Sequence, residues 1–167
     1  MQTNREFFCD AVRMYEKDLY AVAFSVVKNE HDAADVIQDA VLKAYSKLDT
    51  LRNREQVKPW LLKIVHHTAV SFLRSRSKEQ LFAEQDDMPC SDFSPQTDTK
   101  LTVWDYVQQL KLPYRMVLIL FYYQNYSVQD IAKITATPAP AVRQQLSRGR
   151  KMLAGMMKKE DFYERPD

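Results

Sequence analysis

Apolar residues recur at spacings of three and four along most of the chain, the period of an α-helix with one buried face. The first such stripe predicts a helix from Arg5 to Val27, and the second predicts a helix over 32–48. A third stripe predicts a helix from Pro59 to Arg76, since proline suits the first helical turn, where its missing N–H loses no partner. Residues 49–58 are predicted to form a polar loop.

The helical period fails between Ser77 and Thr99, where prolines and polar residues predominate. It returns in helices predicted over 101–110, 113–124 and 128–134, followed by one that starts at Ala139. The chain of 167 residues has two glycines, so folds that need glycine at tight turns or phosphate loops are poorly supported. The sequence therefore predicts an all-α fold of two small helical domains joined by a flexible linker.

The predicted domain boundaries follow from this pattern. They are 1–76 for the first domain, 77–99 for the linker, 100–157 for the second domain and 158–167 for a C-terminal tail. Residues 77–100, which contain the linker, carry two basic and six acidic residues, so this segment is acidic. Positive charge gathers on either side of it, with seven basic residues in 46–76 and six in 143–159. Such clusters suit a polyanion such as DNA, although each alone also suits a solvated helix face.

The cysteines and histidines give no signal for a metal or a cofactor. Cys9 and Cys90 fit two free thiols in a reducing compartment. His66 and His67 are adjacent on a helix, so their side chains diverge by about 100° and cannot easily hold one ion. The N-terminus lacks the apolar core of a signal peptide, and the longest apolar run, 116–123, is too short to cross a bilayer. We expect a cytoplasmic protein without cofactors.

The segment 126–153 carries the pattern of a helix-turn-helix. Ser127 is a good N-cap, and Asp130 three residues later fits a capping box with it. The short helix that follows breaks at 135–138, and a second helix begins at Ala139-Pro140. In such a motif the second helix enters the major groove of DNA. The outward-facing residues of that helix are predicted to be Arg143, Gln144, Ser147, Arg148 and Lys151, which suit phosphates and base edges.

Both halves of the chain resemble sigma factors of bacterial RNA polymerase. The sequences 112–118, 126–132 and 141–150 are similar to sigma region 4, which carries the helix-turn-helix for the −35 promoter element. Residues 32–45 are similar to sigma region 2.2, and 59–76 to the helix that reads the −10 element. The two halves stand in the order of the family, with a linker between them. The chain is thus identified as a member of the extracytoplasmic-function (ECF) type of the sigma-70 family.

The resemblance implies a DNA-reading subunit that directs core RNA polymerase to promoters of a stress or envelope-response regulon and is not an enzyme. Asp35, Gln38 and Asp39 would dock on the clamp-helix coiled coil of the largest polymerase subunit, since a basic partner offsets their like charges. The residues implied for −10 DNA are Arg52, Asn53, Arg54, Lys63, His67, Arg74 and Arg76. The loop around Arg52 would form a pocket for a flipped base. Trp60 is expected to pack in the core instead.

Further implications concern partners and the promoter. Family members often have an anti-sigma factor, commonly anchored in the membrane, so a cognate anti-sigma factor is an implied partner besides core polymerase and promoter DNA. The chain has His66-His67 and Ser71 where the family usually has Arg-Asn and Asp, and Pro140–Gln145 in place of a common Gly-Thr-Val-Lys-Ser-Arg. These departures concern the promoter sequence that is read.

Three other functions compete with this interpretation. A dimeric helix-turn-helix regulator would bind palindromic DNA without polymerase, but it would leave the basic cluster at 46–76 without a role. An enzyme that uses His66 or His67 with Cys9 or Cys90 finds no supporting motif. A purely helical interaction module would leave both basic faces unexplained. The regulator is the strongest alternative.

Overall fold

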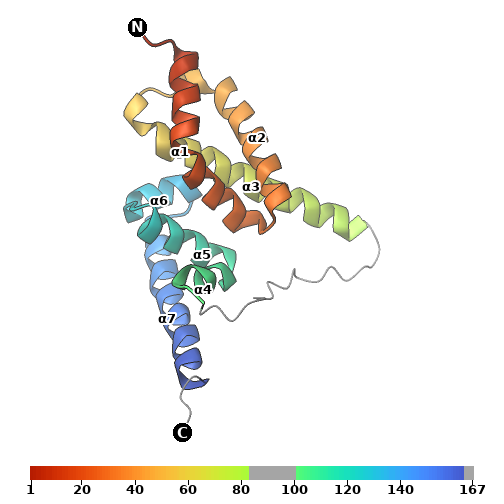
Figure 1. Cartoon of the computed structure of the whole chain (residues 1–167), viewed down its shortest axis with the longest axis vertical. Coiled ribbons are helices and arrows are strands. Elements are labelled where there is room, and N and C mark those ends of the chain that lie inside the picture. The colour runs from red at the N-terminus through yellow and green to blue at the C-terminus, as the bar shows by residue number, and fades with distance from the viewer. Residues whose placement is uncertain (83–100, 164–167) are drawn as a thin grey trace.

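The computed structural model describes residues 1–82 and 101–163, and these are helical with short connections and no strand. Residues 83–99 of the predicted linker, which include Cys90 and most of its acidic residues, lie outside the described residues. Figure 1 shows two groups of helices in contact, with α1–α3 in one group and α4–α7 in the other. The all-α prediction is confirmed for the described residues.

The first group consists of α1 (Asn4–Val27), α2 (Glu30–Ser46) and α3 (Val57–Phe82). The Thr3 hydroxyl accepts the N–H of Glu6, whose carboxylate in turn accepts the Thr3 N–H, so α1 starts with a complete capping box. The turn to α2 is closed by Lys28 in the left-handed region and by the next residue, whose side chain caps α2. Short polar signals therefore set the angle between α1 and α2.

The third helix differs from its prediction at both ends. It begins at Val57, two residues before Pro59, because any position of the first turn tolerates a missing N–H. It also runs past Arg76 to Phe82, into the segment predicted as linker. Residues 77–82 contain strong helix formers such as Lys, Glu, Gln and Leu, which extend a helix that is already nucleated.

The second group consists of α4 (Val103–Gln109), α5 (Leu112–Leu118), η3 (Ile119–Tyr123), α6 (Val128–Thr135) and α7 (Ala139–Tyr163). The single helix predicted over 113–124 is wrong in its last part, because η3 is a π-helix. The N–H of Gln124 bonds to the carbonyl of Ile119, five residues earlier. Four residues separate this wider turn from the start of α6, and Tyr122 and Tyr123 within it are exposed.

The hydrophobic cores of the two groups form one contiguous cluster. The first group contributes apolar residues of all three helices, chiefly Leu19, Val22, Val36, Leu61, Leu62 and Val65. The second group contributes Met116, Leu118, Ile119, Leu120, Ile131, Ile134, Val142 and Leu146. Each fully buried side chain of this kind contributes about 1.5–3 kcal/mol relative to exposure. Gly149 lets α7 approach α5, since a Cβ there would lie 3.2 Å from Leu118 Cδ1.

Polar side chains also join the two groups. The side-chain amide of Gln108 donates to the Ser25 hydroxyl at 3.3 Å, and the Lys28 ammonium donates to the backbone carbonyl of Gln108. Gln124 donates to the Asp18 carboxylate at 3.3 Å. The buried Arg115 caps the end of α4 from within by donating to the carbonyl of residue 110 at 2.7 Å, and burial lowers its pKa to about 10. The α4 end is therefore the point where cations from both groups meet.

The buried His66 makes stability depend on pH. Burial, followed by the neighbouring His67, lowers the pKa of His66 from 6.5 to about 4, and its Nδ1 has no hydrogen-bond partner among the described residues. In the unfolded chain His66 is therefore protonated below pH 6.5, whereas in the folded chain it stays neutral down to about pH 4. We predict that the free energy of unfolding falls by up to about 3 kcal/mol as the pH is lowered through this range.

Urea unfolding at stepped pH measures this effect. His66→Phe, which keeps a flat ring in the core, should lose that part of the pH dependence, whereas the exposed His31→Gln should keep it. An unchanged slope in the His66 variant would contradict a neutral buried imidazole.

The contact between the two groups predicts a measurable coupling between Asp18 and Gln124. A double-mutant cycle of Asp18→Ala and Gln124→Ala should give an interaction free energy of about 1 kcal/mol in thermal unfolding, because each single variant removes the same hydrogen bond. The matched cycle of Asp18→Ala with Gln129→Ala, an exposed residue of α6, should give a value near zero. Equal values in both cycles would mean that the helices are apart in solution.

Candidate nucleic-acid and protein interfaces

The outer face of α2 presents the residues predicted to dock. Asp35, Gln38 and Asp39 are all exposed, while Val36 and Ala40 between them are buried. Asp39 pairs with Lys43 one turn later, with 2.8 Å between carboxylate oxygen and ammonium. This exposed pair is worth a few tenths of a kcal/mol, so a protein partner can exchange it at little cost.

An apolar groove adjoins this face and was missed by the sequence analysis. It has a volume of about 620 Å³ and lies between α1 and α2, with lining residues Glu16, Lys17, Tyr20, Ala34, Ile37 and Gln38. Gln38 belongs to both surfaces. Tyr20 does not fall on the apolar stripe predicted for the first helix, and it is exposed. This aromatic residue outside the stripe was the signal in the sequence that could have indicated the groove.

The polar loop before α3 uses two of its three predicted DNA residues for local contacts. The Asn53 side chain accepts the N–H of Glu55 at 3.0 Å and so caps the short 3-10 helix η2 (Arg54–Gln56). The Arg54 guanidinium donates to Asn4 at 2.7 Å and lies 4.6 Å from the centroid of the Phe7 ring. Arg52 remains exposed without such contacts.

A small cavity lies beside this loop. It measures about 170 Å³ and is lined by Asn4, Phe7, Leu48, Asp49, Leu51 and Arg54. Of the three loop residues predicted to form a base pocket, Arg54 lines it, whereas Arg52 and Asn53 do not. The other walls come from the loop itself, with η1 (Leu48–Thr50), and from the start of α1, which the sequence did not place near the loop.

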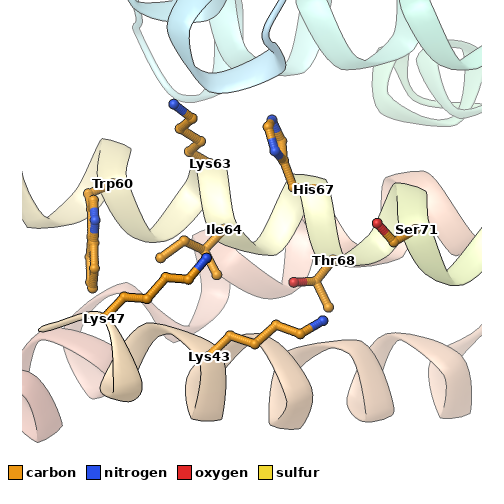
Figure 2. A pocket seen from close by; sticks show the side chains of 8 residues that line it. All are labelled: Lys43, Lys47, Trp60, Lys63, Ile64, His67, Thr68 and Ser71. Atoms are coloured by element: carbon orange, nitrogen blue, oxygen red, sulfur yellow. The ribbon is translucent and has the colours of Figure 1, made fainter. Parts of the chain in front are cut away.

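The predicted DNA residues of α3 divide into two pairs. Lys63 and His67 are exposed one turn apart, and Figure 2 shows both side chains pointing toward the second group of helices. Partial burial and then the Lys63 ammonium lower the pKa of His67, while a hydrogen bond with the backbone of Ile134 acts in the opposite direction. Farther along, Arg74 is exposed and Arg76 pairs with Asp32 of α2.

A basic groove runs between α2 and α3 beneath Lys63 and His67. Its volume is about 410 Å³, and its lining residues are Lys43, Lys47, Trp60, Lys63, Ile64, His67, Thr68 and Ser71 (Figure 2). Trp60 packs against the core, as predicted, but it is half-buried and its other side lines this groove. Sequence analysis missed the α2 lysines, although their spacing of four already placed them on one face.

The exposed face of α7 presents all five residues predicted to read DNA. The side chains of Arg143, Gln144, Ser147, Arg148 and Lys151 are exposed. Val142, Leu146 and Gly149 on the opposite face are buried against the core, as the period predicts. Pro140 lies in the first turn of α7, and Ala136 in the left-handed region closes the tight turn after α6. The helix-turn-helix geometry is therefore present.

The start of α6 is capped as the sequence predicts, with one difference. Ser127 accepts the N–H of Asp130 at 3.2 Å, but the Asp130 carboxylate returns to the Ser127 hydroxyl at 2.8 Å and not to its N–H. At the edge of the α7 face, Arg150 donates to the Tyr122 hydroxyl at 2.6 Å. The π-helix brings this tyrosine to α7, which no local sequence pattern announces.

Metal and membrane sites find little support in the described residues. None of them forms a cluster of three or more histidine, cysteine or acidic side chains able to hold a metal ion. The rings of His66 and His67 lie 5.7 Å apart at 61°, and Cys9 is an exposed free thiol. Within the same part of the chain, no helix combines the length and the apolar character needed to span a bilayer.

Family models match both groups of helices. The model for sigma-70 region 2 matches residues 11–79, and the model for sigma-70 region 4 matches residues 100–153. Together these ranges span more than half of the chain. The basic groove and the α2 face fall in the first range, and the exposed face of α7 falls in the second.

Individual relatives are similar to this chain along most of their length. The chain is 29% identical to the RNA polymerase sigma factor SigV of Bacillus subtilis, over 96% of this chain and 97% of the relative. It is 28% identical to the RNA polymerase sigma factor YlaC of the same organism, over 97% and 98%. The ECF RNA polymerase sigma factor SigW of B. subtilis is 24% identical over 90% and 88%.

A solved structure has the same fold. The sigma factor RpoE of Bartonella quintana, in complex with the anti-sigma factor NepR, superposes with a TM-score of 0.73 over 90% of this chain and 96% of that chain, at 23% identity. Its helices correspond to both groups described above. With two family models in the expected order and relatives of matching length, the chain belongs to the sigma-70 family of sigma factors and, within it, to the ECF type.

Proposed function

We propose that this chain binds core RNA polymerase, directs it to a specific set of promoters and thereby initiates transcription, without catalytic activity of its own. The observation that carries the proposal is the exposed face of α7, where Arg143, Gln144, Ser147, Arg148 and Lys151 stand free above a buried apolar face. A recognition helix needs this division, because its reading side chains must reach base edges while the other side holds the helix in place.

The first contact in the proposal is between α2 and the polymerase. The exposed Asp35 and Asp39 lie one turn apart and repel each other by a few tenths of a kcal/mol in the free chain. A basic coiled coil on the polymerase would replace this repulsion with attraction and would fix the register of docking. The neighbouring apolar groove, which shares Gln38, offers area that an ion pair alone does not provide.

The second contact is with the −10 element. Lys63 and His67 lie side by side on α3, with Arg74 and Arg76 farther along the same helix, and Arg52 is free in the loop. We expect Arg52, Lys63 and Arg74 to bind the DNA backbone, with affinity that falls steeply as salt rises. Arg54, which lines the cavity at the loop and is held by Asn4, is expected to shape that cavity. Asn53 is expected to hold the loop by accepting the N–H of Glu55.

The third contact is with the −35 element through α7. Arginine and glutamine suit guanine and adenine edges, respectively, so Arg148 and Gln144 are the expected readers of sequence. Arg143 and Lys151 would hold phosphates. In the domain organisation we propose, 1–76 forms the polymerase and −10 unit and 100–157 forms the −35 unit.

A protein partner is also part of the proposal. The similar structure of B. quintana RpoE was solved with the anti-sigma factor NepR, and that of CnrH was solved with the cytosolic domain of CnrY. We propose that a cognate anti-sigma factor likewise holds this chain inactive until a stress or envelope signal arrives. The chain itself would then act in the cytoplasm, on the polymerase.

Charge reversal on α2 tests docking. Asp35→Lys/Asp39→Lys should weaken binding to core RNA polymerase about a hundredfold or more, because two attractive contacts become repulsive at the docking face. Binding is measured by fluorescence anisotropy of the labelled chain titrated with core enzyme, and far-UV circular dichroism checks the fold.

The matched control carries the same charge change elsewhere. Asp10→Lys/Glu79→Lys alters two exposed acids on α1 and α3 and should bind core enzyme like the wild type. If wild type bound no core enzyme but bound palindromic duplex DNA tightly alone, the sigma assignment would give way to a dimeric regulator.

Arg148→Ala tests the reading helix. In holoenzyme bound to a promoter selected from a random pool, this change should cost about 1–3 kcal/mol of discrimination at one base pair of the −35 element. Competition between matched and mismatched duplexes measures it. Lys158→Ala, at an exposed position near the far end of α7, should leave discrimination unchanged. Equal losses against every duplex would instead assign Arg148 to phosphate.

A further inference from the structure

Two polar contacts hold the second group of helices against one side of α1. Gln124 donates to the Asp18 carboxylate at 3.3 Å, and the side-chain amide of Gln108 donates to the Ser25 hydroxyl at the same distance. Asp18 and Ser25 are seven residues apart, which places them on the same side of the helix. These four residues, Asp18, Ser25, Gln108 and Gln124, form what we call the polar latch.

Asp18 connects the polar latch to α3. Its carboxylate pairs with the Lys58 ammonium at 2.9 Å, and that ammonium lies 5.9 Å from the centroid of the Tyr126 ring in the second group. Burial, followed by the Asp18 charge, raises the pKa of Tyr126 to about 12. The polar latch and the contact of α6 with α3 are thus parts of one interface.

The polar latch has no spare hydrogen-bond partner. The side-chain oxygens of Gln108 and Gln124 are buried, and neither has a partner among the described residues. If the acceptor on α1 is lost as well, a whole amide is buried without a hydrogen bond, which costs more than the bond itself contributes. Separation of the two groups returns that amide to water. The closed contact therefore depends on each acceptor of the latch.

The closed arrangement, in which α6 contacts α3, cannot hold both promoter elements at once (Figure 1). The −10 and −35 elements lie roughly 25 base pairs apart, which is about 85 Å of B-DNA. The axes of packed helices are roughly 8–10 Å apart, so α3 and the helix-turn-helix that begins with α6 are much closer than that. The two groups must separate before both can bind one promoter.

We propose that the closed arrangement is a self-inhibited state of the free chain, held by the polar latch, and that core polymerase opens it by binding the separated form. The inference rests on the proposed function and adds a regulatory step that needs no anti-sigma factor. The latch residues of the first group lie on α1 and the docking residues on α2, so the polymerase does not need to touch the latch. It needs only to bind the open form more tightly than the closed form.

Ser25→Ala tests the polar latch in the full chain. The change keeps a good helix former in α1 but leaves the buried amide of Gln108 without a partner, which favours separation. Less of the binding free energy is then used for opening, so the apparent affinity for core polymerase should rise about tenfold. Fluorescence anisotropy of the labelled chain titrated with core enzyme measures this, and far-UV circular dichroism checks the fold.

Two controls separate the polar latch from a general change in stability. Ser77→Ala loses the same kind of hydroxyl bond to the carbonyl four residues earlier, at an exposed position of α3, and should change the affinity less than twofold. Ser25→Ala/Gln108→Met replaces both polar partners by apolar groups of similar size, so the affinity should return to within about threefold of the wild type. A tenfold rise in either control, or none in Ser25→Ala, would overturn the latch.

Distances between the two groups show whether the chain opens. Spin labels on Met14→Cys of α1 and Lys133→Cys of α6, two exposed positions, are introduced in a chain with Cys9→Ser/Cys90→Ser. Double electron–electron resonance should give one short distance in the free chain and a distance longer by tens of ångströms in the complex with core polymerase. Adding Ser25→Ala should produce both distances in the free chain.

The outcomes separate self-inhibition from the proposed function. A free chain that already shows the long distance, or a complex that keeps the short one, would overturn self-inhibition and leave the proposed function intact. If the wild type failed to bind core polymerase, the proposed function would fall. The distances in the free chain would then decide on the polar latch. A shift in Ser25→Ala that Gln108→Met reverses would support it, and the absence of a shift would refute it.

Discussion

The packing of α3 is the constraint on which the rest of the structure depends. This helix contacts α1 and α2 in its own group and α6 in the other. Leu61, Leu62 and Val65 are buried by these neighbours, and burial of each contributes about 1.5–3 kcal/mol. A helix surrounded on three sides leaves one narrow surface free, and Lys63 and His67 occupy its edge. The position of the candidate DNA residues is thus a consequence of core packing.

The same packing makes α2 serve two surfaces. Its apolar side, with Val36 and Ala40, packs on the core, so its charged residues lie on the two flanks of the helix. Asp39 belongs to the docking flank and Lys43 to the groove, yet the two form an ion pair. A basic partner that takes Asp39 would release the Lys43 ammonium toward the groove. Because the pair is exposed, the energy involved is a few tenths of a kcal/mol.

Sequence alone predicted what depends on one helix at a time. The period of three and four placed the helices, and it also placed Val142 and Leu146 inside and Arg148 outside. It failed where the outcome depends on two elements that meet in space. The groove forms only where α2 and α3 pack side by side. The hydrogen bond from Arg54 to Asn4 likewise requires that the start of α1 lies beside the loop. The π-turn at η3 likewise follows from packing, since its residues are ordinary helix and strand formers.

The contact of α3 with α6 has a thermodynamic consequence for DNA binding. Lys63 and His67 point toward the second group, and Ile134 at the end of α6 lies against His67. One side of a helix cannot hold α6 and a DNA strand in the same place. Any free energy that favours the closed contact must therefore be subtracted from the affinity for the strand. The Asp18–Gln124 hydrogen bond contributes to that closed contact, so its removal should lower the free energy that must be subtracted.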